Sequence, residues 1–439
     1  MKKYPFIILF TSLLLISYRA GNQDEDSMKE LFNEGQYFFN RGDYQDALHF
    51  YLQLLSKDSL NANFNFKAGE CYLNIPGKET QAIPHFKIAE KKIVPKKSYN
   101  KRDFGETDAP LHLYFYLGNA YRIDNQLDKA LECYKKFMDS PFFWNNYNQD
   151  LVEREIRSCE RAKIIQDAPL QFEKIKLDSN FNTRFSEEFP VISGDGHTMV
   201  FIRRLQFYDA VYYTTIKNGV WEKAVNINPQ IISDGDFYPT GLSYDGTKLL
   251  LVKRTRDESD ICIAYLNDGI WSKAEYISGK INSGARETYA TFAPDENLIY
   301  LSSNRAGGKG GFDIYASHKL SDGSWSKPKN MGKVINTIGD EQSPCFCYSQ
   351  QVLFFSSNNH YNMGGYDIFY SRKIGKKWLI PVNLGYPLNN TGDNLGYYPA
   401  AGCREGYYTF SKEQDSDIYF IKIKSENVLN YKDLDTQNK

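Results

Sequence analysis

The hydrophobic positions of this chain follow two different periods. From residue 28 to residue 166, apolar residues recur at the spacing of an amphipathic helix, with no Asn-Gly or Asp-Gly hairpin turn among them. After Pro169 the pattern changes to short alternating stretches bounded by turn residues. We therefore expect a helical domain over residues 28–166, an all-β domain over residues 167–424 and a polar tail over residues 425–439.

The helical half contains three copies of one pattern. Gly35, Gly69 and Gly118 are each followed 12 or 13 residues later by an alanine, and an aromatic residue stands four positions beyond that alanine. Small residues let two helices approach closely, and the aromatic ring fills the seam between them. The pattern resembles the tetratricopeptide repeat, whose copies are antiparallel helix pairs that stack into an α-solenoid.

The resemblance also implies a binding surface. Tetratricopeptide arrays bind partners in a concave groove lined by the first helix of each pair. Carried over position by position, this places six polar residues on the groove side: Gln36, Asn40, Glu70, Asn74, Asn119 and Arg122. An insert between the second and third copies, KKIVPKKSYNKR from Lys91 to Arg102, carries six positive charges and no acid. It is either a contact for an acidic surface or phosphate, or a solvated loop.

The second half repeats at about 50 residues. An Asp followed by two apolar residues recurs at Asp209, Asp260, Asp313, Asp367 and Asp417, and after each of the first four a Trp follows 11 or 12 residues later. Each copy contains four short strands, which is typical of a β-propeller blade. We expect the Asp carboxylates to accept backbone N–H groups of the preceding loop, and the Trp rings to cover the blade edge.

The two ends of the β domain are complementary. The fifth copy stops after the Asp417 strand, whereas residues 172–183 match a fourth strand that lacks its own first three. We therefore expect five blades, with the strand within residues 172–183 completing the last one. A six-bladed ring is the alternative, but it needs a further copy that the sequence does not contain.

The N-terminus predicts export. Two lysines precede an apolar run from Phe6 to Ser17, which is too short to span a bilayer and is typical of a signal peptide over residues 1–20. A short uncleaved anchor is the alternative. The seven cysteines form no CxxC motif, and we expect small buried side chains with at least one unpaired in a monomer, although export permits disulfides.

Composition and motifs give little sign of catalysis. The net charge of −1 argues against nucleic acid as a partner, and no nucleophile, phosphate-loop or zinc motif is present. We expect neither a cofactor nor a metal. Four carboxylates at matching blade positions could ring one channel mouth or merely cap turns: Glu187, Asp236, Glu287 and Glu341. The alternatives to a non-enzymatic scaffold are a propeller glycoside hydrolase, which needs a suitably spaced carboxylate pair, and a sugar-binding propeller.

The segment SPCFCYSQQVLFFSSNNHYNMGGYDIFYSRK resembles the TolB-like, WD-repeat-like propeller unit. The whole arrangement resembles envelope proteins associated with type IX secretion and gliding motility. Unlike many of them, this chain has no Cys directly after the apolar run and no OmpA-like domain. The resemblance implies a protein-interaction scaffold of the bacterial cell envelope, in the periplasm or on the periplasmic face of the outer membrane. Its partners would be envelope proteins, and its membrane association only peripheral.

Overall fold

A computed structural model describes residues 25–95, 98–255, 258–400, 402–412, 415–425 and 428–429. The expected signal peptide and most of the polar tail lie outside these ranges. The chain divides into two compact units, a helical unit that ends at Ile156 and a propeller unit that begins at Arg157. Within the described ranges, no helix has the length and apolar character needed to cross a membrane.

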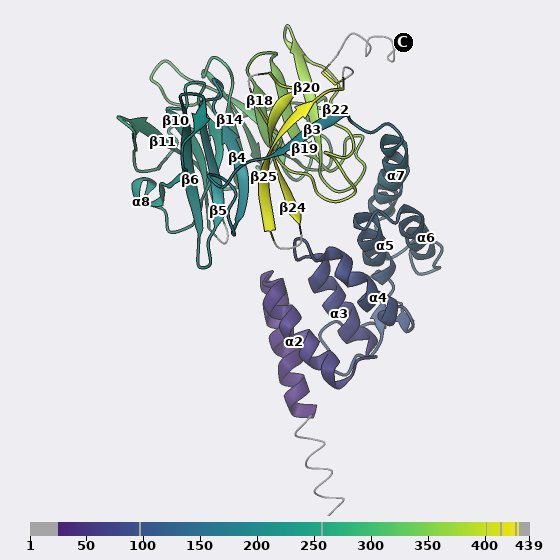
Figure 1. Ribbon diagram of the computed structural model, residues 1–439. Helices are drawn as coiled ribbons and strands as arrows, with labels where there is room; N and C mark the ends of the chain where they lie inside the picture. Colours follow the sequence, from purple (N-terminus) through teal and green to yellow (C-terminus); the bar gives the residue numbers. More distant parts are fainter. Residues whose placement is uncertain are drawn as a thin grey trace, which may run out of the picture. The chain divides into compact units, whose positions relative to one another are not determined.

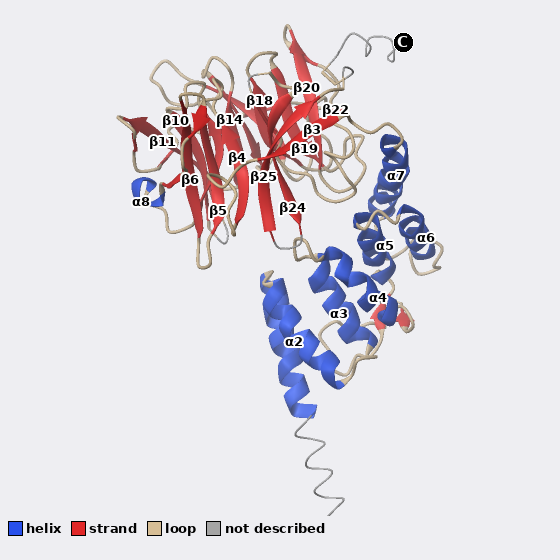
Figure 2. Cartoon of the chain, viewed as in Figure 1, coloured by secondary structure: helices blue, strands red, loops and turns tan. Residues whose placement is uncertain are grey.

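The helical unit is a series of helix pairs (Figures 1 and 2). A helix over residues 25–41 packs on α2 (Tyr44–Lys57), α3 (Ala62–Leu73) packs on α4 (Ala82–Ala89), and α5 (Leu113–Ile123) packs on α6 (Leu127–Met138). A 3₁₀ turn, η1 (Glu79–Gln81), precedes α4, and α7 (Gln149–Gln166) follows the last pair. The insert between α4 and α5 is bracketed by two short parallel strands, β1 (Ile93–Val94) and β2 (Ala109–Pro110).

The repeated glycines lie in the seams between paired helices, as predicted. A Cβ atom added to Gly35, Gly69 or Gly118 would lie 3.0, 2.4 or 2.5 Å from a ring atom of the aromatic residue predicted to face it. These aromatic residues are Tyr51, Phe86 and Tyr134, and all three are fully buried. Any larger residue at the glycine positions would force the helices of a pair apart.

The strands of the propeller unit form five antiparallel sheets within the described ranges, and each sheet is a blade. Blade 1 contains β4 (Ser186–Ile192), β5 (Thr198–Arg204), β6 (Asp209–Lys217), β7 (Val220–Trp221) and β8 (Val225–Asn226), and the short helix α8 (Asn228–Ile231) leads on to blade 2. Blade 2 contains β9 (Phe237–Leu242), β10 (Lys248–Arg254), β11 (Ser259–Asn267), β12 (Ile270–Trp271) and β13 (Glu275–Tyr276). Blade 3 contains β14 (Glu287–Phe292), β15 (Leu298–Ser303), β16 (Asp313–His318) and β17 (Lys329–Asn330). Blade 4 contains β18 (Glu341–Cys347), β19 (Val352–Ser357), β20 (Asp367–Ile374), β21 (Lys377–Trp378) and β22 (Val382–Asn383).

Blade 5 confirms the predicted closure. It contains β23 (Tyr398–Pro399), β24 (Glu405–Lys412) and β25 (Asp415–Ile423), and its fourth strand is β3 (Phe172–Lys176) from the start of the unit. In Figure 1, β3 lies beside the yellow β25, and the register pairs Ile175 with Phe420. The prediction of five blades is therefore confirmed, and the six-bladed alternative is wrong.

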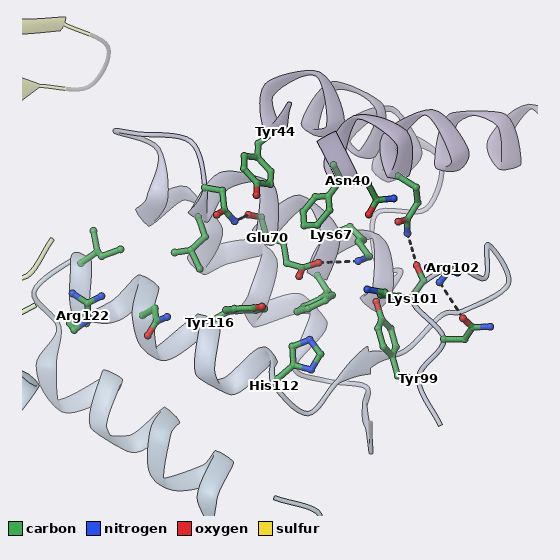
Figure 3. Close-up of a pocket in the computed structure, with 18 residues that line it drawn as sticks. Asn40, Tyr44, Lys67, Glu70, Tyr99, Lys101, Arg102, His112, Tyr116 and Arg122 are labelled. Atoms are coloured by element: carbon green, nitrogen blue, oxygen red, sulfur yellow. Dashed lines mark hydrogen bonds and ion pairs between the residues drawn. The ribbon is translucent and has the colours of Figure 1, made fainter. Parts of the chain in front are cut away.

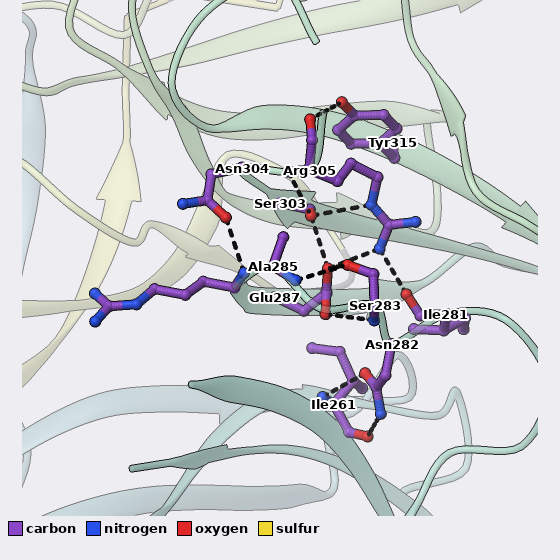
Figure 4. Close-up of polar contacts among 11 residues, drawn as sticks. Ile261, Ile281, Asn282, Ser283, Ala285, Glu287, Ser303, Asn304, Arg305 and Tyr315 are labelled. Atoms are coloured by element: carbon purple, nitrogen blue, oxygen red, sulfur yellow. Dashed lines mark hydrogen bonds and ion pairs between the residues drawn. The ribbon is translucent and has the colours of Figure 1, made fainter. Parts of the chain in front are cut away.

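An asparagine ties each outer loop to the third strand of its blade. In blade 2, the Asn282 amide accepts from the Ile261 backbone N–H at 2.8 Å and donates to the Ile261 carbonyl at 2.9 Å (Figure 4). Asn182, just after β3, makes the same two bonds to Ile418 of β25, at 2.8 and 2.9 Å. The chain thus closes its ring with the contact that it uses inside its other blades.

Two cysteines depart from the expectation of small buried side chains. Cys347 at the end of β18 and Cys403 in the turn between β23 and β24 form a disulfide across blades 4 and 5. The partners are 56 residues apart in the sequence, and the packing of blade 5 against blade 4 brings them together. Of the others, Cys71, Cys133, Cys159 and Cys262 are buried outside this disulfide, and Cys345 is half-buried.

Candidate functional site

The helical unit encloses a groove of about 930 Å³ (Figure 3). All six residues predicted to face the groove line it: Gln36, Asn40, Glu70, Asn74, Asn119 and Arg122. They come from the helix over residues 25–41, from α3 and its C-cap, and from α5, which are the first helices of the three pairs. Within each helix they stand three or four positions apart, a spacing that puts side chains on one face.

The floor of the groove is aromatic. Phe39, Tyr44, Phe66, His112 and Tyr116 line it between the polar residues. The Phe66 ring stacks on Tyr116, with ring centroids 6.1 Å apart, and meets the His112 ring edge-on at 5.4 Å. Phe66 is fully buried, so it supports the half-buried rings around it, and those rings offer a preformed apolar surface to a ligand.

An ion pair crosses the floor. The Lys67 ammonium lies 3.0 Å from Glu70 Oε2 and sits over the Phe39 ring at 5.2 Å. Burial raises the pKa of the Glu70 carboxyl, and the Lys67 charge opposes that rise. Because Lys67 and Glu70 neutralise each other, this pair adds no net charge to the groove.

The basic insert returns across the groove and forms one of its walls. The Tyr99 hydroxyl donates to Asn63 Oδ1 of α3 at 2.7 Å, and Gln36 Nε2 donates to the Lys101 carbonyl at 2.5 Å. Lys101 and Arg102 line the groove, and no carboxylate pairs with them within the described ranges. The sequence analysis left this insert open between a contact surface and a solvated loop. The structure makes it part of the groove.

The predicted polar residues differ in exposure and in the partners that their side chains already have. Asn40 and Asn74 are exposed, and Asn74 Nδ2 donates to the Glu70 carbonyl at 2.7 Å. The Asn119 side chain accepts from the Tyr134 hydroxyl at 2.7 Å, which fixes its orientation. Arg122 is buried, and its Nε lies 3.2 Å from Glu155 of α7. The Arg122 charge is therefore neutralised by Glu155 of the same chain.

The four matched carboxylates of the propeller belong to the turns that open each blade. Glu187, Glu287 and Glu341 are fully buried, and each accepts from the backbone N–H and the hydroxyl of a Thr or Ser four residues earlier. Figure 4 shows Glu287 between Ser283, Ser303 and Arg305. The half-exposed Asp236 accepts from Ser233 and faces Lys253. These contacts favour the turn-capping interpretation over a ring of free acids.

The remaining chemistry is sparse. Among the described residues, no group of three or more His, Cys, Asp or Glu side chains is placed to hold a metal ion. Two Asp residues of the repeat accept backbone N–H groups of the preceding loop, as predicted, whereas Asp209 and Asp417 pair with the side chains of Arg204 and Lys176 instead. Asp313 accepts from the Gly310 backbone N–H at 3.3 Å, and Asp367 accepts from that of Met363 at 2.7 Å.

Comparisons with known proteins place the chain only loosely. No family model matches it, and no curated protein does. Among solved structures, TolB from Acinetobacter baumannii shares 14% identity over 56% of this chain and 56% of its own, with a TM-score of 0.36. The first TPR domain of human RPAP3 shares 19% identity over 31% of this chain and 92% of its own, with a TM-score of 0.24.

An endo-arabinase from Bacteroides thetaiotaomicron shares 13% identity over 58% of this chain and 99% of its own, with a TM-score of 0.40. The chain therefore spans about 56% of the length of the Acinetobacter TolB and nearly all of the arabinase. At these TM-scores, the likenesses assign neither a function nor a partner.

Proposed function

We propose that the protein is a non-enzymatic interaction scaffold of the bacterial cell envelope, and that its helical groove holds an extended, acidic segment of a partner protein. The observation that carries the proposal is the charge of the groove. Lys67 is paired with Glu70, and Arg122 with Glu155. Lys101 acts on Glu70 only at longer range, and neither it nor Arg102 forms an ion pair within the described ranges, so the excess charge of the groove is positive.

The groove offers three kinds of contact to such a segment. The exposed amides of Asn40 and Asn74 can bond the main chain of an extended peptide, which carries one donor and one acceptor per residue. The half-buried Tyr116 ring, held in place by the buried Phe66 ring that it stacks on, can cover an apolar side chain. Lys101 and Arg102 then attract the acidic side chains, so binding weakens as salt rises.

The proposal includes the subcellular location, which is the cell envelope outside the cytoplasm. The apolar run of residues 6–17 supports export, and the Cys347–Cys403 disulfide fits an oxidising compartment. A link to type IX secretion or gliding rests on the domain arrangement alone. Identification of the bound partners tests it.

The test compares two double variants of the same insert. Lys101→Gln with Arg102→Gln removes the charges that line the groove. The control, Lys91→Gln with Lys92→Gln, removes the same charge from exposed positions outside the groove lining. Partners are isolated from gently crosslinked envelopes and identified, and their acidic segments are then titrated as synthetic peptides. We expect the groove variant to weaken peptide binding about tenfold or more and the control to leave it unchanged.

A result in which both double variants bind like the wild type contradicts the proposal. Circular dichroism and thermal melts of the two variants show whether either substitution disturbs the fold. Neither pair of side chains makes an ion pair within the described ranges, so we expect unchanged melting.

A further inference from the structure

Two arginines occupy the same position in blades 1 and 2. Arg204 ends β5 and stands opposite Asp209, the first residue of β6. Arg254 ends β10 and stands opposite Ser259, the first residue of β11 (Figure 1). The two positions are one blade apart in the repeat, so their surroundings can be compared residue by residue.

In blade 1 the arginine guanidinium is paired with two carboxylates. Arg204 Nη2 donates to Glu188 Oε2 at 2.8 Å, and Arg204 Nη1 donates to Asp209 Oδ2 at 3.0 Å. Glu188 comes from the innermost strand β4, and Asp209 from β6. This is an arginine held between two carboxylates of its own chain.

In blade 2 neither carboxylate stands opposite or beside the arginine. Tyr238 stands at the place that Glu188 has relative to Arg204, and Ser259 lies opposite Arg254, because the repeat Asp of this blade, Asp260, is one position further along, opposite Lys253. The Arg254 guanidinium lies over the Tyr238 ring, 4.3 Å from its centroid, and 5.9 Å from that of Tyr289. Within the described ranges, no hydrogen bond or ion pair reaches this guanidinium.

A hydroxyl group on the strand facing Arg254 also lacks a partner. Ser259 is 6% exposed, and its Oγ is buried with no hydrogen-bond partner. Buried polar groups are normally bonded, so an unbonded hydroxyl opposite an unpaired guanidinium favours an acceptor that comes from outside the chain.

Three acids near Arg254 are already engaged, and Asp260 points to the other face of its strand. Glu188 and Asp209 bond Arg204, and Asp209 also accepts from the Tyr238 hydroxyl at 2.9 Å. Asp236 faces Lys253, with 3.5 Å between the charged atoms. Asp260 follows Ser259 on β11, and successive side chains of a strand point to opposite faces. The Tyr238 hydroxyl bond fixes the ring on which Arg254 lies, so the guanidinium is held in place while its N–H groups stay unpaired.

We propose that Arg254, Tyr238 and Ser259 form a second binding site, which takes a carboxylate side chain of an acidic peptide segment. A guanidinium presents its N–H groups in a planar fork that matches a carboxylate with two parallel hydrogen bonds. Ser259 lies on the facing strand with its hydroxyl buried, so it leaves the place opposite Arg254 without a carboxylate and adds no competing charge. The ligand carboxylate takes the place that Asp209 holds beside Arg204 in blade 1.

The neighbouring surface favours a peptide over an acidic sugar. Phe207 is 87% exposed and Tyr208 is 43% exposed, on the turn that leads into Asp209. The loop before β9 packs against this turn, because a Cβ atom at Gly235 would lie 3.2 Å from Tyr208 Cβ. An acidic residue with apolar neighbours therefore finds a cation and apolar surface together. This site lies in the propeller unit and does not depend on the helical groove.

The decisive variant places a carboxylate of the protein itself opposite Arg254. Ser259→Asp recreates the pairing of blade 1, so the new side chain satisfies Arg254 and competes with any ligand. We expect the variant to melt at a higher temperature than the wild type and to lose carboxylate binding. A residue with a purely structural role gives no such combination of gained stability and lost binding.

The probe is a random peptide library displayed on phage and selected on the purified protein. Selected peptides are synthesised with Glu or Asp and with the matching Gln or Asn. We expect enrichment of acidic residues flanked by apolar ones. Binding should fall about 10- to 100-fold in Arg254→Gln, in Ser259→Asp and in the amide peptides. The control Arg184→Gln removes an exposed arginine on a neighbouring blade and should leave binding unchanged.

Three outcomes overturn the proposal: no acidic enrichment, equal binding to the wild type and to Ser259→Asp, or capture of glucuronate oligosaccharides in preference to the peptides. Peptides that depend on Lys101 and Arg102 instead of Arg254 report on the helical groove. The two sites can therefore fail separately.

Discussion

Three buried glutamates hold equivalent places in their blades but have different neighbours. Glu187 accepts from Arg203 at 2.7 Å and Glu287 from Arg305 at 2.8 Å. Among the described residues, Glu341 instead accepts from Thr337 and Ser357 alone. In blade 4, His360 Nε2 contacts the Ile335 carbonyl, the kind of contact that both arginines make with Phe181 and Ile281. Burial lowers the pKa of His360, which favours the neutral imidazole, so His360 does not replace the positive charge of the two arginines.

The pKa of Glu341 should make the stability of the propeller depend on pH. Burial, and to a lesser extent the nearby Asp313, raises it to about 7. Between its ordinary pKa near 4.5 and this value, the folded state binds a proton that the unfolded state lacks. Stability therefore falls as pH rises through this window, by at most about 1.4 kcal/mol per pH unit. Glu341→Gln should flatten this slope and be more stable than the wild type at alkaline pH.

Urea unfolding followed across this pH range measures the slope. Glu405→Gln is the control, because Glu405 forms only an exposed pair with Lys422. An unchanged slope in Glu341→Gln would show that another group titrates.

At the residue scale, the sequence predicted positions better than contacts. The six groove residues could be found because repeat spacing places them on one helix face. Tyr99, Lys101 and Arg102 could not, because the return of the insert depends on isolated hydrogen bonds to Asn63 and Gln36 and on the short β1–β2 pairing. The pairing of Arg122 with Glu155 was missed for the same reason, since 33 residues and no periodic signal separate the two.

At the element scale, ring closure rests on the pairing of β3 with β25 and on Asn182. The Asn182 side chain makes three hydrogen bonds of 2.8–2.9 Å, two of them to Ile418 and one to the Leu177 carbonyl. Asn282 makes two such bonds to Ile261 within one continuous blade. The closing contact and the internal contact are therefore a matched pair.

Asn182→Ala and Asn282→Ala should destabilise the propeller to a similar extent. Each leaves buried backbone groups without partners, which costs about 1–3 kcal/mol. The measurement is the unfolding midpoint in denaturant, and deletion of residues 171–182 should lower it much further. If Asn182→Ala behaves like the wild type while Asn282→Ala is destabilised, the ring is not closed by this strand in solution.

Elements were predicted where a period repeats and missed where it breaks. The blades, the helix pairs and the closing strand follow from copies of one pattern. The split of the outer strand into two short pieces that both pair with the third strand, as β7 and β8 do with β6, does not. The disulfide between blades 4 and 5 was also invisible, because its partners belong to different copies.

At the scale of the whole molecule, the proposed contacts are electrostatic and non-covalent. The groove and the Arg254 site both present positive charge on a chain whose net charge is −1. Such contacts hold a protein at a surface reversibly, and they are screened by salt.

Fractionation of cells should therefore find the protein in the periplasmic soluble pool, or on the outer membrane in a form that salt or a mild chaotrope releases. Labelling with radioactive palmitate should give no band. Retention until detergent is added, or a labelled band, would mean that an anchor outside the described residues holds the protein.

The closing strand also sets an order of events during synthesis. β3 leaves the ribosome before any other strand of its blade, and its partner Asp417 lies 241 residues further along the chain. Until then it is a lone strand, which in an apolar sequence would invite pairing with other chains. Its sequence is FEKIK, in which Glu173, Lys174 and Lys176 are exposed even in the finished ring. These charges keep β3 from pairing with other chains before β25 is available. The last blade to form is therefore the one that closes the ring.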